Sequence, residues 1–149
     1  MVHPGADQLP TSLPPAARET LLAAARKTLD RSYARYSNFR VGAAILTDDG
    51  EVFTGVNVEN ASYGLTNCAE RSAIFTAVQQ SKMAKLSIRA VAVVTAADVP
   101  CSPCGACRQV IFEFGDDAVV IFKGQDSNDE DGYLEMSIKD LLPHSFRLS

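Results

Sequence analysis

The amino-acid sequence predicts an α/β protein, a three-layer α/β/α sandwich around a mixed five-stranded sheet. The chain has 149 residues, 46% of them apolar, which is enough for one domain with a substantial core. In its second half, apolar runs alternate with segments of helical periodicity, and this alternation is typical of parallel strands with helices on both faces. Earlier, Asp48-Asp49-Gly50 separates two apolar runs as a hairpin turn does, which adds an antiparallel strand.

The first half of the chain is expected to supply a tail, a helix and that hairpin. Residues 1–15 contain four prolines, so we expect a flexible N-terminal tail, followed by a single domain over 16–149. A helix is predicted over 16–32, because apolar residues recur there at helical spacing. The strands of the hairpin are expected at 41–47 and 52–58. The apolar residues of the helix are Leu21, Leu22, Ala25 and Leu29.

The second half is expected to alternate helices and strands. Ile74, Phe75 and Val78 are predicted on one side of the first of these helices. The run at 88–97 is almost entirely apolar, which is typical of a strand covered on both faces, and Gly115 is placed to end the second helix. The predicted elements are, in order, helix 68–81, strand 88–97, helix 104–114, strand 119–123, edge strand 133–138 and helix 139–142.

Composition excludes several functional classes. The formal net charge is -4 and the isoelectric point about 5.1, which argues against a protein that binds the phosphate backbone of nucleic acids. No apolar run approaches the ~18 residues of a membrane span. The N-terminus has no apolar region of the kind that secretory signals contain. The sequence therefore predicts a cytoplasmic protein with neither a membrane nor a nucleic acid as partner.

The four cysteines are the most informative residues of the sequence. They are Cys68, Cys101, Cys104 and Cys107. Buried free thiols are the simplest interpretation of an isolated cysteine, but three cysteines at intervals of three beside proline and glycine favour a metal site. A disulfide framework is disfavoured in a chain of cytosolic character. Clustered thiolates suit zinc or an iron–sulfur centre.

The placement of these cysteines favours a catalytic zinc ion. Cys68 opens one predicted helix, and Cys104 and Cys107 share a face at the start of another. Helix N-termini carry unpaired N–H groups that stabilise thiolates. Three thiolates leave the fourth zinc position open for water. A closed four-cysteine structural zinc is the alternative, but it would have no use for the nearby Glu70, which can act as general base and general acid at an open site.

Two residues keep alternative interpretations. Both 100–104 and 103–107 fit the pattern Pro-Cys-x-x-Cys, and we choose the second, because Pro103 can precede a helix but would interrupt one that joined Cys101 to Cys104. Cys101 is then a bystander thiol. Arg71 could face the sulfurs and offset the negative charge of three thiolates, or could form an ordinary surface ion pair.

At this point the sequence resembles the zinc-dependent cytidine deaminases of the small homotetrameric type. Their zinc chemistry is known to combine such a ligand set with a glutamate. The resemblance covers most of the chain from the first helix onward. It is carried by C-A-E at 68–70, P-C-G-A-C-R-Q at 103–109, Y-S-N-F-R-V-G-A-A at 36–44, G-V-N-V-E-N-A-S-Y at 55–63 and L-L-P-H-S-F at 141–146.

The resemblance implies one zinc ion per chain, a nucleoside substrate and a homotetramer with shared active sites. Asn57 and Glu59 would hold the ribose, Phe39 would pack against sugar and base, and the backbone near Ala69 would contact the pyrimidine. Phe146 corresponds to the terminal aromatic residue that reaches a neighbour's site. Arg40 departs from the family, which usually has proline there, and this leaves the chain before the first strand less restrained.

The implied activity is the hydrolytic deamination of cytidine, and of 2'-deoxycytidine, to the uridine product and ammonia in pyrimidine salvage. Glu70 would be the catalytic residue, with Cys68, Cys104 and Cys107 as the metal ligands. A sister enzyme that acts on an aminonucleoside antibiotic such as blasticidin S is the alternative, although the N-V-E-N segment at 57–60 favours an ordinary nucleoside. A polynucleotide-editing deaminase and a non-enzymatic zinc module are two further classes.

Overall fold

A computed structural model describes residues 13–125 and 130–148 and contains the predicted mixed five-stranded sheet, in the order β2-β1-β3-β4-β5. The hairpin strands β1 and β2 pair antiparallel, as β1 does with β3 and β4 with β5, whereas β3 and β4 are parallel. The parallel pair brackets α3, as a strand–helix–strand unit requires. The bounds are β1 (Val41–Thr47), β2 (Val52–Val56), β3 (Ile88–Thr95), β4 (Val119–Lys123) and β5 (Tyr133–Ser137).

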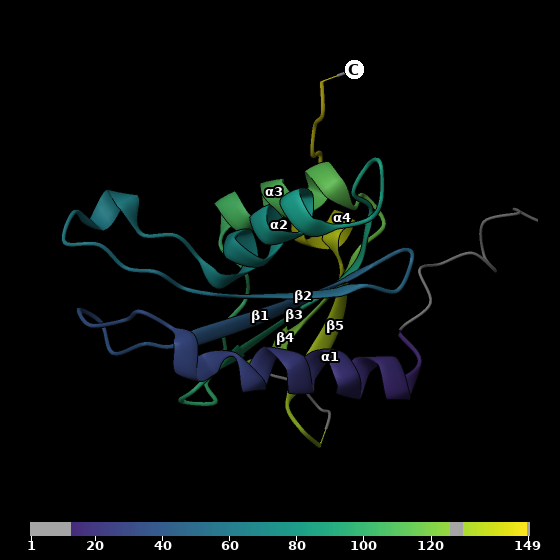
Figure 1. The fold of residues 1–149 in the computed structure, drawn as a ribbon. Coiled ribbons are helices and arrows are strands. Elements are labelled where there is room, and N and C mark those ends of the chain that lie inside the picture. The colour runs from purple at the N-terminus through teal and green to yellow at the C-terminus, as the bar shows by residue number, and fades with distance from the viewer. Residues whose placement is uncertain (1–12, 126–129, 149) are drawn as a thin grey trace, which may run out of the picture.

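Helices cover both faces of the sheet (Figure 1). Among the helices of the described residues, α1 lies by itself on one face, over β1 and β3. The opposite face carries the other three helices, and α2 packs against β1 and β2 there. Because strand side chains alternate, β1 contributes Ala44 to the α1 side of the core, and Ala43 and Ile45 to the other side. The helices are α1 (Pro15–Lys27), α2 (Ala69–Gln80), α3 (Gly105–Phe114) and α4 (Ile138–Leu141), with short 3-10 turns at Leu29–Arg31 and Tyr63–Leu65.

The N-terminal boundary differs from the prediction. Of the tail expected at 1–15, residues 1–12 lie outside the described residues, but Leu13 is buried with Leu21 and Leu22 in the core beneath α1. Pro15 starts the helix, where its fixed φ is already helical and its missing N–H has no partner to lose. The packed domain therefore includes 13–15, which the sequence assigned to the tail. Within the described ranges, no helix has the length and apolarity needed to span a membrane.

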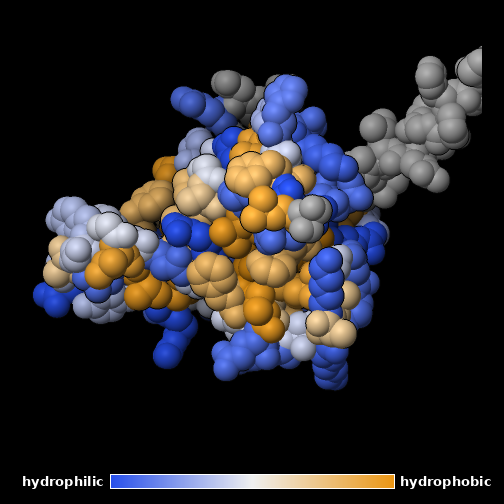
Figure 2. All heavy atoms as spheres, turned by 90° about the horizontal axis from the view of Figure 1, so that it is seen from above, coloured by the Kyte–Doolittle hydropathy of each residue, from blue (hydrophilic) through white to orange (hydrophobic). Residues whose placement is uncertain are grey.

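The face carrying α2 also departs from the expected pattern. Ile74 is fully buried, but Phe75 and Val78, predicted on the same side, are 50% and 53% exposed. An apolar surface of this kind is a common mark of an interaction site. Figure 2 looks onto this side of the molecule and shows apolar residues gathered across it.

Helix α2 lies unusually close to β2, and Gly55 explains why. A Cβ atom at this position would lie 2.7 Å from the Ala69 carbonyl oxygen and 2.8 Å from Ala73 Cα, with the Ala73 nitrogen closer still. Only glycine lets the strand backbone touch the helix in this way. The start of α2, and the residues it carries, is thereby set against the sheet.

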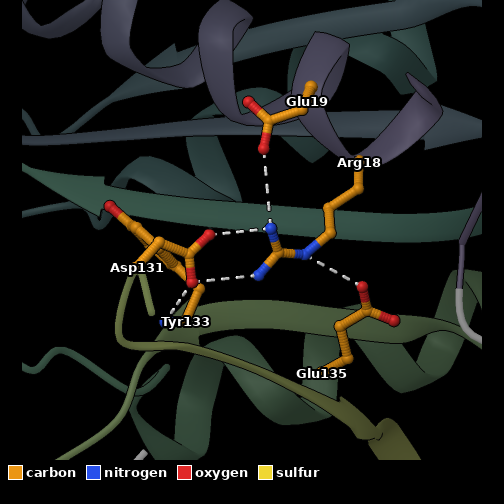
Figure 3. Close-up of polar contacts among 5 residues, drawn as sticks. All are labelled: Arg18, Glu19, Asp131, Tyr133 and Glu135. Carbon is orange, nitrogen blue, oxygen red and sulfur yellow. Dashed lines mark hydrogen bonds and ion pairs between the residues drawn. The ribbon is translucent and has the colours of Figure 1, made fainter. Parts of the chain in front are cut away.

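A cluster of charged side chains holds α1, on the other face of the sheet, in place (Figure 3). Arg18 of α1 donates to the Asp131 carboxylate at 2.8 Å and lies 3.1 Å from the Glu135 carboxylate of β5. The hydrogen bond with Arg18 holds the pKa of Asp131 below its usual value and raises the pKa of Arg18. Both partners are therefore stabilised in their charged forms, and the cluster joins the first helix to the last strand.

Candidate active site

The starts of α2 and α3 bring three sulfur atoms together. Cys68 is the residue that caps α2, and Cys104 caps α3 with its Sγ accepting from the Cys107 N–H at 3.5 Å. Both capping residues have extended backbone, so their side chains lie at the open ends of the helices. Two helix N-termini thus converge on one place, and each contributes unpaired N–H groups and a positive dipole end.

The spacing of these sulfurs fits one tetrahedral zinc ion. The ligand atoms of Cys68, Cys104 and Cys107 all lie within 4.8 Å of one another, and the Cys68 and Cys104 sulfurs are 3.9 Å apart. With Zn–S bonds of about 2.3 Å, a tetrahedron requires a sulfur–sulfur separation of roughly 3.8 Å. Cys101 is not a member of this group, and its N–H donates to the Lys123 carbonyl. The three cysteines predicted as ligands are the three that the fold assembles.

The thiols differ strongly in acidity. Hydrogen bonds from the Cys107 thiol and from Arg71 lower the pKa of Cys68 to about 5, against the opposing effect of burial. The hydrogen bond to Cys68, together with burial, raises the pKa of Cys107. Burial also raises the pKa of Cys101 to about 11. A thiolate is therefore ready at Cys68 to receive a cation, whereas Cys101 is held as an inert thiol.

Arg71 faces the sulfurs rather than a surface carboxylate. Its guanidinium donates to the Cys68 Sγ at 3.2 Å, and this contact raises the pKa of Arg71. Among the described residues its Nε has no hydrogen-bond partner although it is buried. Of the two interpretations of Arg71, the observed contact is the one that offsets thiolate charge.

Glu70 lies in the first turn of α2 and is buried, with 4% of its surface exposed. Burial raises its pKa, outweighing the hydrogen bonds that favour the carboxylate, one of them from the Cys107 thiol. A buried carboxyl group beside the Cys68 and Cys107 thiols, which forms no salt bridge within the described part of the chain, is expensive in a purely structural role. Such placement is typical of a group that exchanges protons with a ligand.

The predicted ribose contacts, Asn57 and Glu59, follow β2 and lie between two loops. Val58 pairs with Asn67, directly before Cys68, and also forms a bridge to Tyr33. Asn57 is buried, donates to the Phe39 carbonyl at 2.7 Å and accepts from the Val41 N–H. The segment is thus tied to the start of α2 on one side and to the loop before β1 on the other.

Glu59 and Phe39 belong to that same loop network. The Glu59 carboxylate accepts from the Tyr36 and Ser37 N–H groups and from the Ser37 hydroxyl, and these contacts, led by the hydroxyl, lower its pKa. Phe39 is 38% exposed, its N–H donates to Ser37 Oγ at 3.0 Å, and its carbonyl is held by Asn57. These bonds restrain Phe39 although Arg40, the next residue, is not a proline.

Phe146 lies apart from this network. It is 67% exposed in the segment after α4, and its carbonyl accepts from the Gln109 side chain at 3.2 Å. Ala69, in contrast, is fully buried at the start of α2. The structure thus gathers the sulfurs, Glu70 and Arg71 at one place and leaves Phe146 facing outward.

The family model for the zinc-binding region of cytidine and deoxycytidylate deaminases matches residues 15–123. The chain belongs to this family. A cytidine deaminase of Sporosarcina psychrophila is 42% identical over 128 residues, which cover 86% of this chain and 90% of that protein.

Solved structures agree with this family membership. The cytidine deaminase of Burkholderia pseudomallei is 45% identical with a TM-score of 0.74, covering 86% of this chain and 98% of that one. The enzyme from Mycobacterium tuberculosis is 36% identical, also with a TM-score of 0.74, over 88% of this chain and 98% of that one. The expected family and its three-layer fold are confirmed.

Sequence reasoning gave no role to two residues that support the site of this deaminase. Arg108 donates to the Pro103 carbonyl at 2.8 Å and to the Leu141 carbonyl at 2.8 Å, which fixes the loop before Cys104 onto α4. Ser37 orients Glu59. An arginine beside a metal ligand is a visible signal in the sequence, but its partner 33 positions away is not.

Proposed function

We propose that this chain catalyses the hydrolytic deamination of cytidine and 2'-deoxycytidine. The observation that carries the proposal is the convergence of three cysteine sulfurs from two helix starts beside the buried Glu70. Three protein ligands leave a zinc ion one open position. Hydrolysis also requires a group beside that position that exchanges protons, and Glu70 is such a group. Membership of the deaminase family directs this chemistry to an amino group on a pyrimidine.

The protein side of the reaction falls mainly to Glu70. When bound by the three sulfurs, zinc would supply the acidity that a water molecule needs to attack carbon. Glu70 accepts the proton of that water and passes it to the ring nitrogen. It then takes the second proton from the hydroxyl group now on C4 and delivers it to the amino group, so that the bond from C4 to nitrogen breaks and ammonia leaves while the oxygen stays on the ring as the carbonyl of the uridine product. One carboxyl group can perform both transfers because it is buried and adjacent to the open position.

Arg71 is proposed to support the metal site. Three thiolates on a divalent ion leave a net charge near -1, which opposes the ionisation of water. The hydrogen bond from Arg71 to Cys68 draws negative charge away from that sulfur. The two helix N-termini act in the same direction.

We propose that the nucleoside is held by Phe39, Asn57, Glu59 and the backbone at Ala69. The bridge from Val58 to Asn67 supports this role, because it ties the N-V-E-N segment directly to the residue before Cys68. An amide and a carboxylate suit the hydroxyl groups of a sugar, and buried partners of a hydroxyl discriminate strongly against analogues that lack it. The exposed ring of Phe39 offers a flat apolar surface to the sugar and base.

We further propose a cytoplasmic homotetramer whose subunits share active sites. The exposed apolar residues Phe75 and Val78 on α2, and the apolar side shown in Figure 2, would be covered by another copy of the chain. The outward-facing Phe146 would then reach a neighbour's nucleoside. The thiols that hold zinc must stay reduced, which favours the cytoplasm.

A deaminase assay combined with metal analysis tests the proposal. Purified protein is incubated with cytidine, and the change in ultraviolet absorbance is followed with and without a zinc chelator, while zinc per chain is measured. We expect about one zinc ion per chain, turnover of cytidine, and loss of turnover as zinc is removed. Zinc-loaded protein that leaves both cytidine and 2'-deoxycytidine unchanged would contradict the proposal.

A further inference from the structure

The side chain of Arg147 anchors the segment after α4. Residues 142–148 contain no helix or strand, and the segment rises away from the layer of helices (Figure 1). Phe146 and Leu148 are 67% and 91% exposed, but Arg147 between them turns back toward the body of the protein. Such a segment needs a specific anchor if its aromatic residue is to have a defined position.

The anchor binds the C-terminal end of α3. Arg147 donates to the Glu113 carbonyl at 3.4 Å, forms an ion pair with Asp116, and lies over the Phe112 ring at 5.2 Å from its centroid. The last carbonyl groups of a helix lack intrahelical partners, and a cation there also meets the negative end of the helix dipole. Arg147 therefore binds a site that the helix itself creates.

A second contact holds the same segment closer to the metal. Gln109 lies two residues after the ligand Cys107 on α3, and its side chain donates to the Phe146 carbonyl at 3.2 Å. One helix thus carries two metal ligands at its start and grips the C-terminal segment at its middle and end. The position of Phe146 is thereby set relative to the metal site by a single rigid element.

We infer that Arg147 is a positioning residue that presents Phe146 to the nucleoside site of a second copy of this chain. The inference rests on the proposed function, because it needs Phe146 to contact the neighbour's substrate. Arg147 itself touches no substrate. Its removal would leave the Gln109 contact as the remaining hold on Phe146, so the aromatic ring would be less ordered before the substrate binds and binding would be weaker.

Steady-state kinetics with cytidine test the inference. We expect Arg147→Ala to raise KM by about threefold to tenfold, which corresponds to the loss of roughly one hydrogen bond. The kcat and the number of subunits should change little. Phe146→Ala should raise KM at least as much. The double variant should be no worse than Phe146→Ala alone, because an anchor has no effect once the anchored ring is absent. Arg31→Ala, which removes an exposed arginine after α1, is the matched control and should leave KM unchanged.

A fluorescence measurement reports the position directly. The chain contains no tryptophan, so Phe146→Trp introduces a single tryptophan, which can be excited selectively over the four tyrosines. Adding Arg147→Ala should shift its emission to the red and increase its quenching by iodide. If Arg147→Ala does not fold, Asp116→Asn removes the same ion pair from the other side and should give the same changes.

The outcomes distinguish a failure of the proposed deaminase activity from a failure of the role given to Arg147. Absence of deaminase activity in the native protein would overturn the proposed function. A KM unaffected by Phe146→Ala would remove the shared-site role of Phe146 and the inference with it. If Phe146→Ala raises KM but Arg147→Ala does not, or if the two effects multiply, the assignment of Phe146 stands and the positioning role of Arg147 is wrong.

Discussion

Both faces of the sheet carry charged groups close to the core, but the pKa values of their carboxyl groups are shifted in opposite directions. On the α1 face, Arg18 meets Asp131 and Glu135, and hydrogen bonding lowers the pKa of Asp131. On the α2 face, Glu70 is buried beside thiols, and burial raises its pKa. Pairing within the protein dominates on one side, and loss of solvent dominates on the other.

This difference separates a structural cluster from a reactive one. Arg18 and Asp131 satisfy one another and need no ligand, and together with Glu135 they hold α1 against β5, although the second carboxylate oxygen of Glu135 is buried without a hydrogen-bond partner among the described residues. Beside the three sulfurs, the buried Nε of Arg71 also lacks a hydrogen-bond partner among the described residues, and the sulfurs lie at the spacing of a metal site. Functional sites characteristically retain such unmet interactions, because a ligand is to complete them. The following experiments test whether that contrast is real.

The largest effect should come from removing a metal ligand. Cys107→Ala deletes a sulfur of the three-sulfur group, and the protein should lose its zinc and all turnover. Cys101→Ala provides the matched control, since this cysteine lies outside the group and should keep zinc at the native level. Metal content per chain decides the result, and zinc retained by the first variant but lost by the second would reverse the assignment of ligands.

Replacing the proton-transfer group should be nearly as damaging but should spare the metal. Glu70→Gln preserves the shape of the side chain and removes its ability to exchange a proton. We expect kcat to fall by about 10²–10⁴-fold with zinc content and thermal stability maintained. Full activity in this variant would show that Glu70 transfers no proton in the reaction and has a structural role only.

A smaller effect should follow from crowding the helix that carries Glu70. Gly55→Ala places a Cβ within 2.7 Å of the Ala69 carbonyl oxygen, so α2 must shift. We expect a loss of about 1–3 kcal/mol in the free energy of unfolding, together with weaker zinc binding. Gly64→Ala is the control, because nothing lies within 4 Å of the added atom and Gly64 is not at positive φ. Urea titration of both variants measures the difference, and equal stability would show that α2 adjusts without strain.

The chemistry of the metal site was predictable from sequence because its signals are local. Cys104 and Cys107 are three residues apart, and Pro103 restricts where their helix can begin. The hairpin was likewise encoded in three adjacent turn residues. Each of these inferences depends on the geometry of a single helix start or turn, which short-range sequence determines.

The remaining features depend on distant partners that no local pattern reveals. Asn57 uses its amide to hold the loop before β1, and Arg147 finds Asp116, 31 positions away. Helical periodicity placed Phe75 and Val78 on one side with Ile74, but periodicity does not say whether that side meets the sheet or the surface. Leu13 packs into the core despite the prolines that follow it, because Pro15 starts a helix instead of preventing one.

The smallest effect belongs to the α1 face and completes the contrast. Arg18 and Asp131 have 17% and 38% of their side chains exposed, so solvent screens the pair and Arg18→Ala should cost at most about 1 kcal/mol. Because the pKa of Asp131 in the folded protein lies below its unfolded value of about 3.9, the contribution is complete above that pH and is lost only as pH falls through the folded pKa. The difference in unfolding free energy between native and Arg18→Ala protein should therefore stay constant from pH 8 to 5 and shrink in 1 M salt.

Zinc affinity should weaken over the same interval, because the ligand thiols must release protons to bind the ion. If the Arg18 contribution varied with pH as zinc binding does, the two faces would not be electrostatically independent, and the cluster on α1 would be part of the active site.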